Sequence, residues 1–395
     1  MDTNAIFLGR KLDLEGLKVN KDTPIEYKLA YICKRFRLSG DLLLYRWIPS
    51  GHINMTYYVA MFDGHEARQY LVQKINWYVF KQPVEMMHNL EQISDHIIGS
   101  NPNMERRRRL HFHHTDEGNT WLKIDEGEDM EFWRLTNFVE NSVSFETADG
   151  DPKVLQQSGK AFGRFVNQLK DFDATQLVES IPHFHDTRYR LNTFFTDVDE
   201  DVCGRVAECK EDIDLIRKYS DYACKLCDMV EEGKLPIRVT HNDTKTNNVL
   251  FDHKTLDPLV IIDLDTCMPG LVCHDFGDTI RFAACTAVED EKDVSKMKLD
   301  LKLFRAFTEG FVGEIANLLT PEEIATMADG AAIITLELAS RFLDDYLTGD
   351  KYFRIDYAEH NLVRARAQLA LFKDMMLHLD EMKEIVNEVA EKNIK

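Results

Sequence analysis

Hydrophobic and polar residues are arranged in two different ways along this chain. Near the start, apolar residues at helical spacing follow Pro24 and continue to Phe36, which predicts a helix. Runs rich in Val, Ile, Leu and Tyr then predict strands, two of which flank Asp63-Gly64 as an antiparallel hairpin. Strands are expected at 42–48, 53–62, 68–75, 121–124 and 132–139, with a further helix from Val84 to Ile97.

From Asp151 onward the apolar positions follow the period of helices. Residues 154–169 trace one apolar helix face, and strand-like runs return only at 249–251 and 259–262. The composition changes near 137–140, where we place a lobe boundary. We therefore predict an α+β chain with a 1–24 N-terminal extension, a 25–140 small lobe built on an antiparallel sheet with one main helix, and a larger, mostly helical 141–395 lobe.

Composition narrows the classes of protein to which the chain can belong. Its 395 residues exceed the usual size of one compact domain, and 44% of them are hydrophobic, enough for a large core. The net charge of −20 argues against nucleic acid or an anionic membrane as a bulk partner. We find no apolar run of membrane-span length and no signal-peptide pattern, and the eight cysteines lack the spacing of a disulfide framework. We expect a cytoplasmic protein with reduced thiols.

One short loop, Thr240-His-Asn-Asp-Thr-Lys-Thr-Asn-Asn248, carries the side chains that phosphoryl transfer requires. Its spacing follows the catalytic loop of protein kinases, in which an Asp meets the acceptor hydroxyl and an Asn five residues later binds magnesium. Asp243 is the expected catalytic base and Asn248 a metal ligand, while Lys245 could neutralise charge on the transferred group. Together with the two-lobe pattern, the loop predicts a protein-kinase-like fold that uses ATP and Mg²⁺.

A second metal ligand is expected at Asp263. The apolar run Leu259 to Ile262 ends in this carboxylate, fifteen residues beyond Asn248, and oxygen ligands suit magnesium. Asp275-Phe276-Gly277 spells the protein-kinase metal motif, but no apolar strand precedes it. We therefore interpret Asp275 and Asp278 as supports of the loop or as helix caps.

The small lobe offers weaker signals. On the predicted strand, Val72 and Lys74 share one face, so Val72 could touch adenine and Lys74 a phosphate, with Glu85 or Glu91 as the partner of the lysine. The segment Ser50 to Asn54 has the context of a phosphate-covering loop but only one glycine. The backbone around Phe138 and Val139 is expected to receive adenine. The strand with Val72 and Lys74 and the loop from Ser50 to Asn54 could each be ordinary hairpin structure.

Three other features have plain structural alternatives. Cys224-x-x-Cys227 lies in a helical pattern without a second pair at zinc spacing, and the histidines at 111, 113 and 114 follow a basic run, 106–109. Arg341 lies in a helical pattern with an acidic residue four positions to either side, so surface ion pairing could explain it.

Several longer motifs resemble those of the N-acetylhexosamine 1-kinases, within the aminoglycoside phosphotransferase and choline kinase superfamily. Besides the 240–248 loop, the resemblance includes Gly51-His-Ile-Asn54, Pro182-His-Phe-His-Asp-Thr187, Ile261-Ile-Asp-Leu-Asp-Thr266, Met268-Pro-Gly270, Asp275-Phe-Gly-Asp-Thr-Ile-Arg-Phe282, Arg341-Phe-Leu-Asp-Asp-Tyr-Leu347 and Glu359-His-Asn-Leu-Val-Arg364. It covers nearly the whole chain. The longer start and extra residues around 106–114 depart from the family pattern.

The resemblance implies transfer of a phosphoryl group from ATP to the anomeric hydroxyl of N-acetylglucosamine or N-acetylgalactosamine. Asp243 would then meet that hydroxyl, and the sugar site would be lined by His52, Thr266, Phe282, Arg341 and Tyr352. We expect a monomer whose partners are the sugar and ATP. A kinase for choline or an aminoglycoside, and a nucleotide-binding pseudokinase, are the alternatives.

Overall fold

The computed structural model describes residues 5–8, 11–49, 53–125, 127 and 130–394. The chain forms two compact units, Met1–Asn141 and Ser142–Lys395. The first is built on an antiparallel sheet and the second is mainly helical, so the predicted fold class is confirmed.

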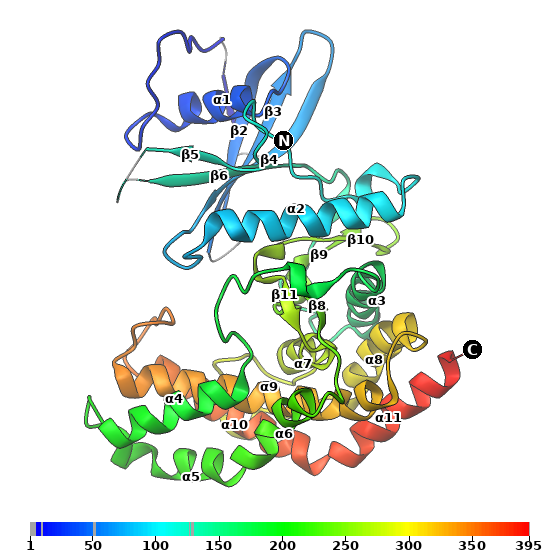
Figure 1. Ribbon diagram of the computed structural model, residues 1–395. Coiled ribbons are helices and arrows are strands. Elements are labelled where there is room, and N and C mark those ends of the chain that lie inside the picture. Colours follow the sequence, from blue (N-terminus) through cyan, green and yellow to red (C-terminus); the bar gives the residue numbers. More distant parts are fainter. Residues whose placement is uncertain (1–4, 9–10, 50–52, 126, 128–129, 395) are drawn as a thin grey trace. The chain divides into compact units, whose positions relative to one another are not determined.

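The sheet of the first unit has six strands in the order β1-β2-β3-β4-β6-β5, all antiparallel (Figure 1). The strands are β1 (Ile6–Phe7), β2 (Asp41–Ile48), β3 (Met55–Phe62), β4 (Ala67–Ile75), β5 (Leu122–Ile124) and β6 (Glu131–Asn137). The predicted hairpin is confirmed: Asp63 accepts backbone hydrogen bonds from His65 and Glu66, and Gly64 takes the positive φ that the turn needs.

The segment before the first helix, expected as an extension, contributes to this sheet. In β1, Ile6 pairs with Tyr45 of β2, so the segment supplies the edge strand. Leu8, Leu12 and Leu14 pack against the hydrophobic core. Partial burial of these side chains stabilises the described part of the segment against the core.

Two helices cover opposite faces of the sheet. On α1 (Ile25–Arg35), Leu29 and Ile32 are fully buried in a core that they share with Val59, Val72 and Trp133. On the other face lies α2 (Pro83–Ser100), where Met87 meets the buried side chain of Arg134. The basic run forms a short 3-10 turn, η1 (Arg106–Arg108).

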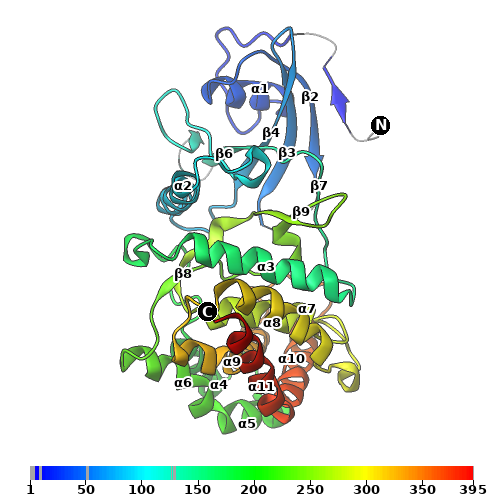
Figure 2. The same ribbon diagram turned by 90° about the vertical axis from the view of Figure 1, so that its right-hand side faces the viewer.

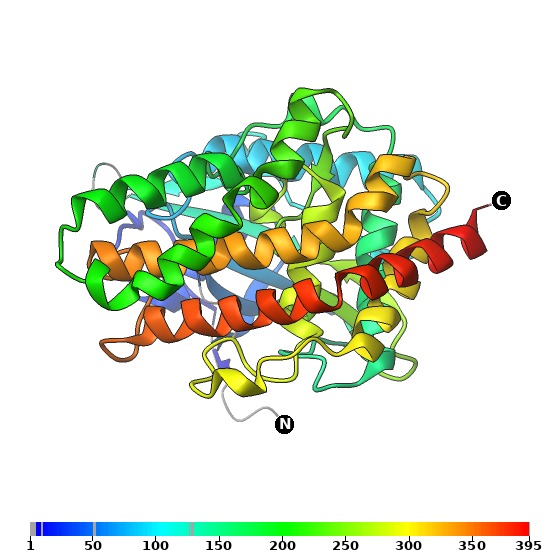
Figure 3. The same cartoon turned by 90° about the horizontal axis from the view of Figure 1, so that it is seen from below.

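The second unit is built around a long central helix, α9 (Pro321–Thr348). Thr320 and Glu323 form a reciprocal capping box at its start, and Gly349 ends it in the left-handed region at φ 100°. Seen from below, α4 and α10 lie on either side of α9 (Figure 3). The other helices are α3 (Pro152–Gln168), α4 (Thr187–Glu200), α5 (Lys210–Lys218), α6 (Ser220–Glu231), α7 (Val272–Ala283), α8 (Leu301–Ile315), α10 (His360–Leu377) and α11 (Leu379–Asn393).

Glycines allow α3 and α8 to pack at close range (Figure 2). A Cβ atom on Gly310 would collide with the carbonyl oxygen of Gln156, and one on Gly159 would lie 2.5 Å from that of Phe307. The predicted apolar face of α3 is buried, including Leu155 and Phe162. No larger residue fits either glycine position without separating the helices.

Short strands and 3-10 turns of the second unit surround the predicted catalytic loop, residues 240–248. β7 (Ser142–Val143), β9 (Val249–Asp252) and β10 (Pro258–Ile261) form one sheet in the order β10-β9-β7, and β8 (Arg238–Thr240) pairs with β11 (Met268–Gly270). The 3-10 turns are η3 (Ala174–Gln176), η4 (Val206–Cys209), η5 (Thr246–Asn248), η6 (Leu264–Thr266) and η7 (Val294–Lys296).

The described residues form no helix that combines the length and the apolar character of a membrane span. The eight cysteines are unpaired, and the CxxC motif lies on α6 as predicted.

Candidate active site

The catalytic loop runs from the end of β8 into η5, and the strand pairings of the second unit fix both of its ends. Thr240 of β8 pairs with Met268 of β11. At the other end, Asn248 accepts a 2.9 Å hydrogen bond from the amide of Ile262 through its backbone oxygen. Asp263 is the next residue, so the β9–β10 hairpin brings the two predicted metal ligands to the same end of one sheet.

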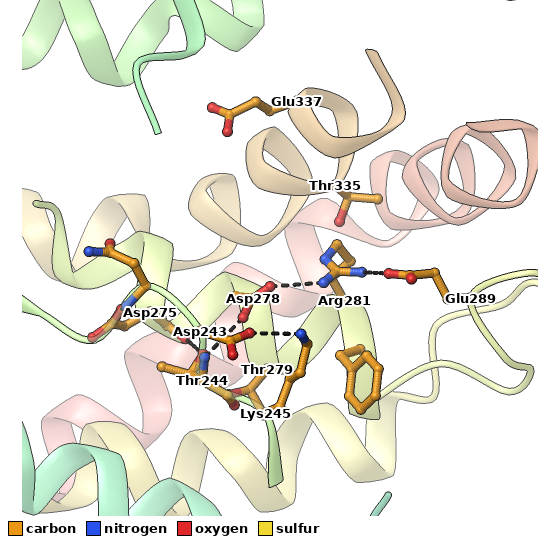
Figure 4. A network of polar contacts seen from close by, with 12 residues as sticks. Asp243, Thr244, Lys245, Asp275, Asp278, Thr279, Arg281, Glu289, Thr335 and Glu337 are labelled. Atoms are coloured by element: carbon orange, nitrogen blue, oxygen red, sulfur yellow. Dashed lines mark hydrogen bonds and ion pairs between the residues drawn. The ribbon is translucent and has the colours of Figure 1, made fainter. Parts of the chain in front are cut away.

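Asp243 lies between two donors from its own loop, Lys245 and Asn248, of which Figure 4 shows Lys245. Its carboxylate is 2.8 Å from the ammonium of Lys245 and accepts a 3.0 Å hydrogen bond from the side-chain amide of Asn248. Burial alone would raise the pKa of Asp243, but the charge and hydrogen bond of Lys245 outweigh it and hold the pKa below its ordinary value. Asp243 is therefore ionised, and its contacts with Lys245 and Asn248 fix the orientation of its carboxylate.

His241 links the catalytic loop to the segment that carries Asp263. Its imidazole is fully buried, with Nε2 3.0 Å from the carbonyl oxygen of Ile262 and Nδ1 3.3 Å from the backbone nitrogen of Asp243. Burial lowers the pKa of His241, so the ring is neutral. The contacts define its tautomer: Nε2 donates to Ile262, and Nδ1 accepts from the amide of Asp243.

Asn248 and Asp263 offer the donor set of a hard cation. Because the amide nitrogen of Asn248 donates to Asp243, its amide oxygen is the atom suited to a metal. Asp263 adopts the left-handed region at φ 59°, a conformation that is costly for a residue with a side chain and is concentrated at functional sites. An amide oxygen and a carboxylate fit magnesium, which keeps several waters and is bound through few protein ligands.

Two aspartates on α7 hold the backbone of the catalytic loop (Figure 4). Asp275 accepts hydrogen bonds of 2.8 and 2.7 Å from the amides of His241 and Asn242, and Asp278 accepts one of 3.0 Å from the amide of Thr244. The prediction that both support the loop is confirmed. Burial raises the pKa of Asp275 to about 7, and the two backbone donors oppose that rise.

Replacing Asp275 by alanine should lower the free energy of unfolding by about 2–6 kcal/mol, because two buried N–H groups lose their acceptor at ~1–3 kcal/mol each. Urea unfolding of the purified variant would measure this. The exposed Asp257, replaced by alanine, is the control and should unfold at the wild-type midpoint. An Asp275→Ala midpoint equal to that of wild type would contradict the anchoring role.

The predicted sugar-site residues fall into two groups within the second unit. Near the catalytic loop, the ring of Phe282 lies 5.9 Å from the ammonium of Lys245, and the hydroxyl of Thr266 donates a 2.7 Å hydrogen bond to the carbonyl of His241. On α9, Arg341 faces Tyr352, whose side chain is 63% exposed. His52 lies outside the described residues.

Arg341 does not form the surface ion pairs that its spacing allowed. Its guanidinium lies 5.4, 5.7 and 5.6 Å from the ring centres of Phe184, Tyr352 and Phe353. The two acidic neighbours on α9 have other partners: Glu337 bonds to His185, and Asp345 accepts from backbone amides at 351–353. Aromatic faces favour a cation, so the rings hold Arg341 in place.

In the first unit, Val72 and Lys74 share one face of β4 as predicted, and that face is the one α1 covers. Val72 is fully buried in the core with α1, which leaves it no exposed surface for adenine. Lys74 pairs at 2.7 Å with Glu131 of β6, rather than with Glu85 or Glu91 of α2.

The strand that was expected to reach Val139 ends at Asn137. Beyond it, the amide of Phe138 donates to the carbonyl of Gln69, and its ring meets Tyr58 edge to face. Val139 is buried. The amide of Phe138 is thus already used within the first unit. The predicted adenine contact needs other backbone groups of this segment.

Glu131 is shared by two lysines and a tryptophan. Besides Lys74, it accepts hydrogen bonds of 2.9 Å from the buried ammonium of Lys28 and from the indole of Trp133. Burial alone would raise the pKa of Glu131, but the hydrogen bonds from the lysines lower it. The cluster was not predicted, because Lys28 and Glu131 are distant in sequence.

Replacing Glu131 by glutamine should lower the free energy of unfolding by about 3–5 kcal/mol, because a buried ammonium loses its counter-charge. Replacing Lys74 by methionine should cost far less, since Lys28 still neutralises Glu131. Urea unfolding of both variants compares the two. If Glu131→Gln and Lys74→Met unfolded at the same urea concentration, the negative charge of Glu131 would not be what stabilises the buried ammonium of Lys28.

The histidines at 111–114 have ordinary partners. Burial lowers the pKa of His113 to about 4, and His114 lies 2.6 Å from Glu91. Within the described ranges, no three His, Cys, Asp or Glu side chains converge as a metal-binding group. The predicted magnesium site has two protein ligands, Asn248 and Asp263, and one of them is an amide, so it is not a group of this kind.

Comparison with known proteins identifies the family. Residues 48–300, well over half of the chain, match the family model described as "Phosphotransferase enzyme family". The match begins in the sheet of the first unit and includes the catalytic loop, Asp263 and α7.

Solved kinases share the fold at low sequence identity. A microcompartment-associated aminopropanol kinase superposes with a TM-score of 0.57 at 14% identity, covering 90% of this chain and 98% of its own. An amicoumacin kinase, solved with AMP-PNP, Ca²⁺ and Ami, gives 0.53 at 12% identity, with 95% and 97% covered. A choline kinase from Cryptosporidium parvum Iowa II gives 0.51 at 14% identity, with 88% and 93% covered. At these identities the likeness is one of fold.

Proposed function

This chain belongs to the phosphotransferase enzyme family, and we propose that it transfers the γ-phosphoryl group of ATP to the anomeric hydroxyl of N-acetylglucosamine or N-acetylgalactosamine. The observation that carries the reaction type is the carboxylate of Asp243, ionised and held between Lys245 and Asn248. The acceptor is the finer part of the proposal and rests on the motifs around that loop.

In this reaction Asp243 accepts a hydrogen bond from the acceptor hydroxyl and orients its oxygen. The transition state of phosphoryl transfer is loose, so direction matters more than a strong base, and an ionised carboxylate of low pKa suffices. The proton moves to Asp243 as the acceptor oxygen bonds to the γ-phosphorus and the bond from that phosphorus to the bridging oxygen breaks, which releases ADP. Lys245, already beside Asp243, offsets negative charge on the phosphoryl oxygens.

We propose that Asn248 and Asp263 hold magnesium, as their oxygen donors suggest. When bound, magnesium neutralises charge on the phosphate oxygens of ATP. Lys74 and the backbone at Phe138 and Val139 are the proposed nucleotide contacts of the first unit. Protein kinases also pair a strand lysine with a glutamate, which in them lies on a helix. Here the partner of Lys74 is Glu131, which lies on strand β6.

The surroundings of Arg341 favour a sugar over an alkylammonium acceptor. Choline or an aminoglycoside needs acidic groups or free aromatic faces around its positive charge. Here Phe184, Tyr352 and Phe353 already surround a guanidinium, so a cationic acceptor would be repelled at this place. A neutral sugar can instead accept hydrogen bonds from Arg341 and stack against an exposed ring.

Replacing Arg341 by methionine should raise the KM for N-acetylglucosamine by about 10- to 100-fold, the size of one or two hydrogen bonds to a charged group. The KM for ATP should stay within a factor of two. Replacing the exposed Arg354, which follows α9, by methionine is the control. Unchanged sugar KM in Arg341→Met would exclude this side chain from the acceptor site.

ADP release with Mg²⁺-ATP across a panel of acceptors tests the proposal as a whole. N-acetylglucosamine or N-acetylgalactosamine should give the highest kcat/KM, above simple hexoses, choline, aminopropanol and aminoglycosides. Preference for an amino alcohol or aminoglycoside would support the alternative kinases. Magnesium-dependent ATP binding without release for any acceptor would support the pseudokinase.

A further inference from the structure

The segment Ser180–Thr187, here called the strap, has so far entered the proposal only through the ring of Phe184 beside Arg341. It ends at the first residue of α4 and contains the His-Phe-His-Asp-Thr motif. Its contacts reach three places in the candidate site: the residue before Asp243, the turn after Asp263, and helix α9.

The contacts of the strap are specific. At its start, the hydroxyl of Ser180 donates a 3.0 Å hydrogen bond to the carbonyl of Asp265, two residues after Asp263. At its end, Thr187 donates a 2.6 Å hydrogen bond to Glu337 of α9. Between them the ring of Phe184 meets the guanidinium of Arg341 at 5.4 Å.

His185 forms the central contact of the strap. Its Nδ1 lies 2.9 Å from Oε1 of Glu337, and its Nε2 lies 3.5 Å from the carbonyl oxygen of Asn242. The side chain is mostly buried, and that of Glu337 is nearly completely so. Figure 4 shows Glu337 on α9, above the network of Asp243.

Both ring nitrogens of His185 face acceptors, a carboxylate oxygen at Nδ1 and a carbonyl oxygen at Nε2. A carbonyl oxygen can only accept, and Glu337 is ionised. Burial alone would raise the pKa of Glu337, but the hydrogen bond and charge of His185 lower it to about 2. The neighbouring His274 lowers the pKa of Glu337 less than His185 does, and burial lowers the pKa of His274 itself to about 4.

We propose that His185 is a positioning residue for phosphoryl transfer, an imidazolium that joins Glu337 of α9 to the peptide carbonyl immediately before Asp243. Asn242 adopts the left-handed region at φ 63°, a strained conformation that its surroundings must hold, and its carbonyl belongs to the peptide bond that leads into Asp243. Asp275 holds the amide of Asn242, and His185 holds its carbonyl, which fixes the residue from both sides.

This inference rests on the proposed function, in which Asp243 orients the acceptor hydroxyl. It adds a connection: the same strap that restrains Asp243 through His185 contacts Arg341 through Phe184. One segment thereby restrains the positions of both Arg341, the proposed acceptor contact, and Asp243, the catalytic carboxylate.

The test compares His185→Gln with His183→Gln in the full-length protein. His183 lies on the same strap, but its side chain is half exposed and bonds only to Asp186 and the ring of Tyr189 among the contacts described. We expect His185→Gln to lower kcat by about 10- to 100-fold, the range for a displaced catalytic group, with the KM for ATP within a factor of two. His183→Gln should match wild type.

Nitrogen-15 NMR of histidine-labelled protein provides a readout that does not depend on the acceptor. Both ring nitrogens of His185 should resonate as protonated at neutral pH, and Glu337→Gln should remove one of these protons while lowering kcat as His185→Gln does. If wild type phosphorylates no sugar, the proposed function fails, while the NMR result still decides the state of His185. An unprotonated ring nitrogen, a wild-type kcat in His185→Gln, or equal losses in kcat and in ATP binding would overturn the positioning role.

Discussion

Replacing Asp243 by asparagine should lower kcat by about 100- to 10,000-fold, the contribution expected of a positioned general base. The amide has nearly the shape of the carboxylate, so the contact with Asn248 can persist while the charge facing Lys245 is lost. The KM values for ATP and sugar should change little, because the lost interaction develops in the transition state. Steady-state kinetics with ATP and N-acetylglucosamine would measure the effect.

The control for this prediction is Asp257→Asn, an exposed aspartate of the β9–β10 connection. It should retain wild-type kinetics, and both variants should show similar thermal unfolding, which separates loss of chemistry from loss of fold. Turnover near the wild-type level in Asp243→Asn would mean that another group receives the acceptor hydroxyl.

Replacing Asp263 by asparagine should lower kcat/KM for ATP by about 1,000-fold at ordinary magnesium concentrations. A metal on transferring phosphate contributes several kcal/mol to the transition state, and about 4 kcal/mol corresponds to this factor. Asp263 follows β10, whereas Asp275 accepts from two buried amides of the catalytic loop, so the change should affect stability far less than Asp275→Ala.

A magnesium titration sharpens the test of Asp263. In Asp263→Asn, activity should rise with magnesium well beyond the concentration that saturates wild type, since one ligand of the site is weakened rather than the catalytic base. Asp275→Asn should keep the wild-type magnesium dependence. If the two variants behaved in the opposite way, the Asp-Phe-Gly motif would be the metal site after all.

The sequence predicted the parts of this protein that depend on local pattern. Strand alternation around Asp63-Gly64 predicted the hairpin, and the spacing from Asp243 to Asn248 and Asp263 predicted side chains that the β9–β10 hairpin does bring to one end of a sheet. The absence of an apolar strand before Asp275 was enough to identify it as a support rather than a metal ligand.

What the sequence could not predict depends on contacts between distant segments. Lys74 pairs with Glu131 because β4 and β6 are neighbours in the sheet, and no spacing rule contains that neighbour relation. The acidic residues around Arg341 suggested ion pairs, but Glu337 and Asp345 face partners on other segments. The role of His185 needed the strap, the catalytic loop and α9 in one place, although its motif was already visible.

The position of the phosphate on the product tests the central claim most directly. Phosphorus-31 NMR of the product formed from ATP and N-acetylglucosamine, or from N-acetylgalactosamine, should show a phosphate coupled to the anomeric proton, with loss of the reducing end. A product phosphorylated at another hydroxyl with its reducing end intact, or no sugar phosphate from either sugar, would contradict the account.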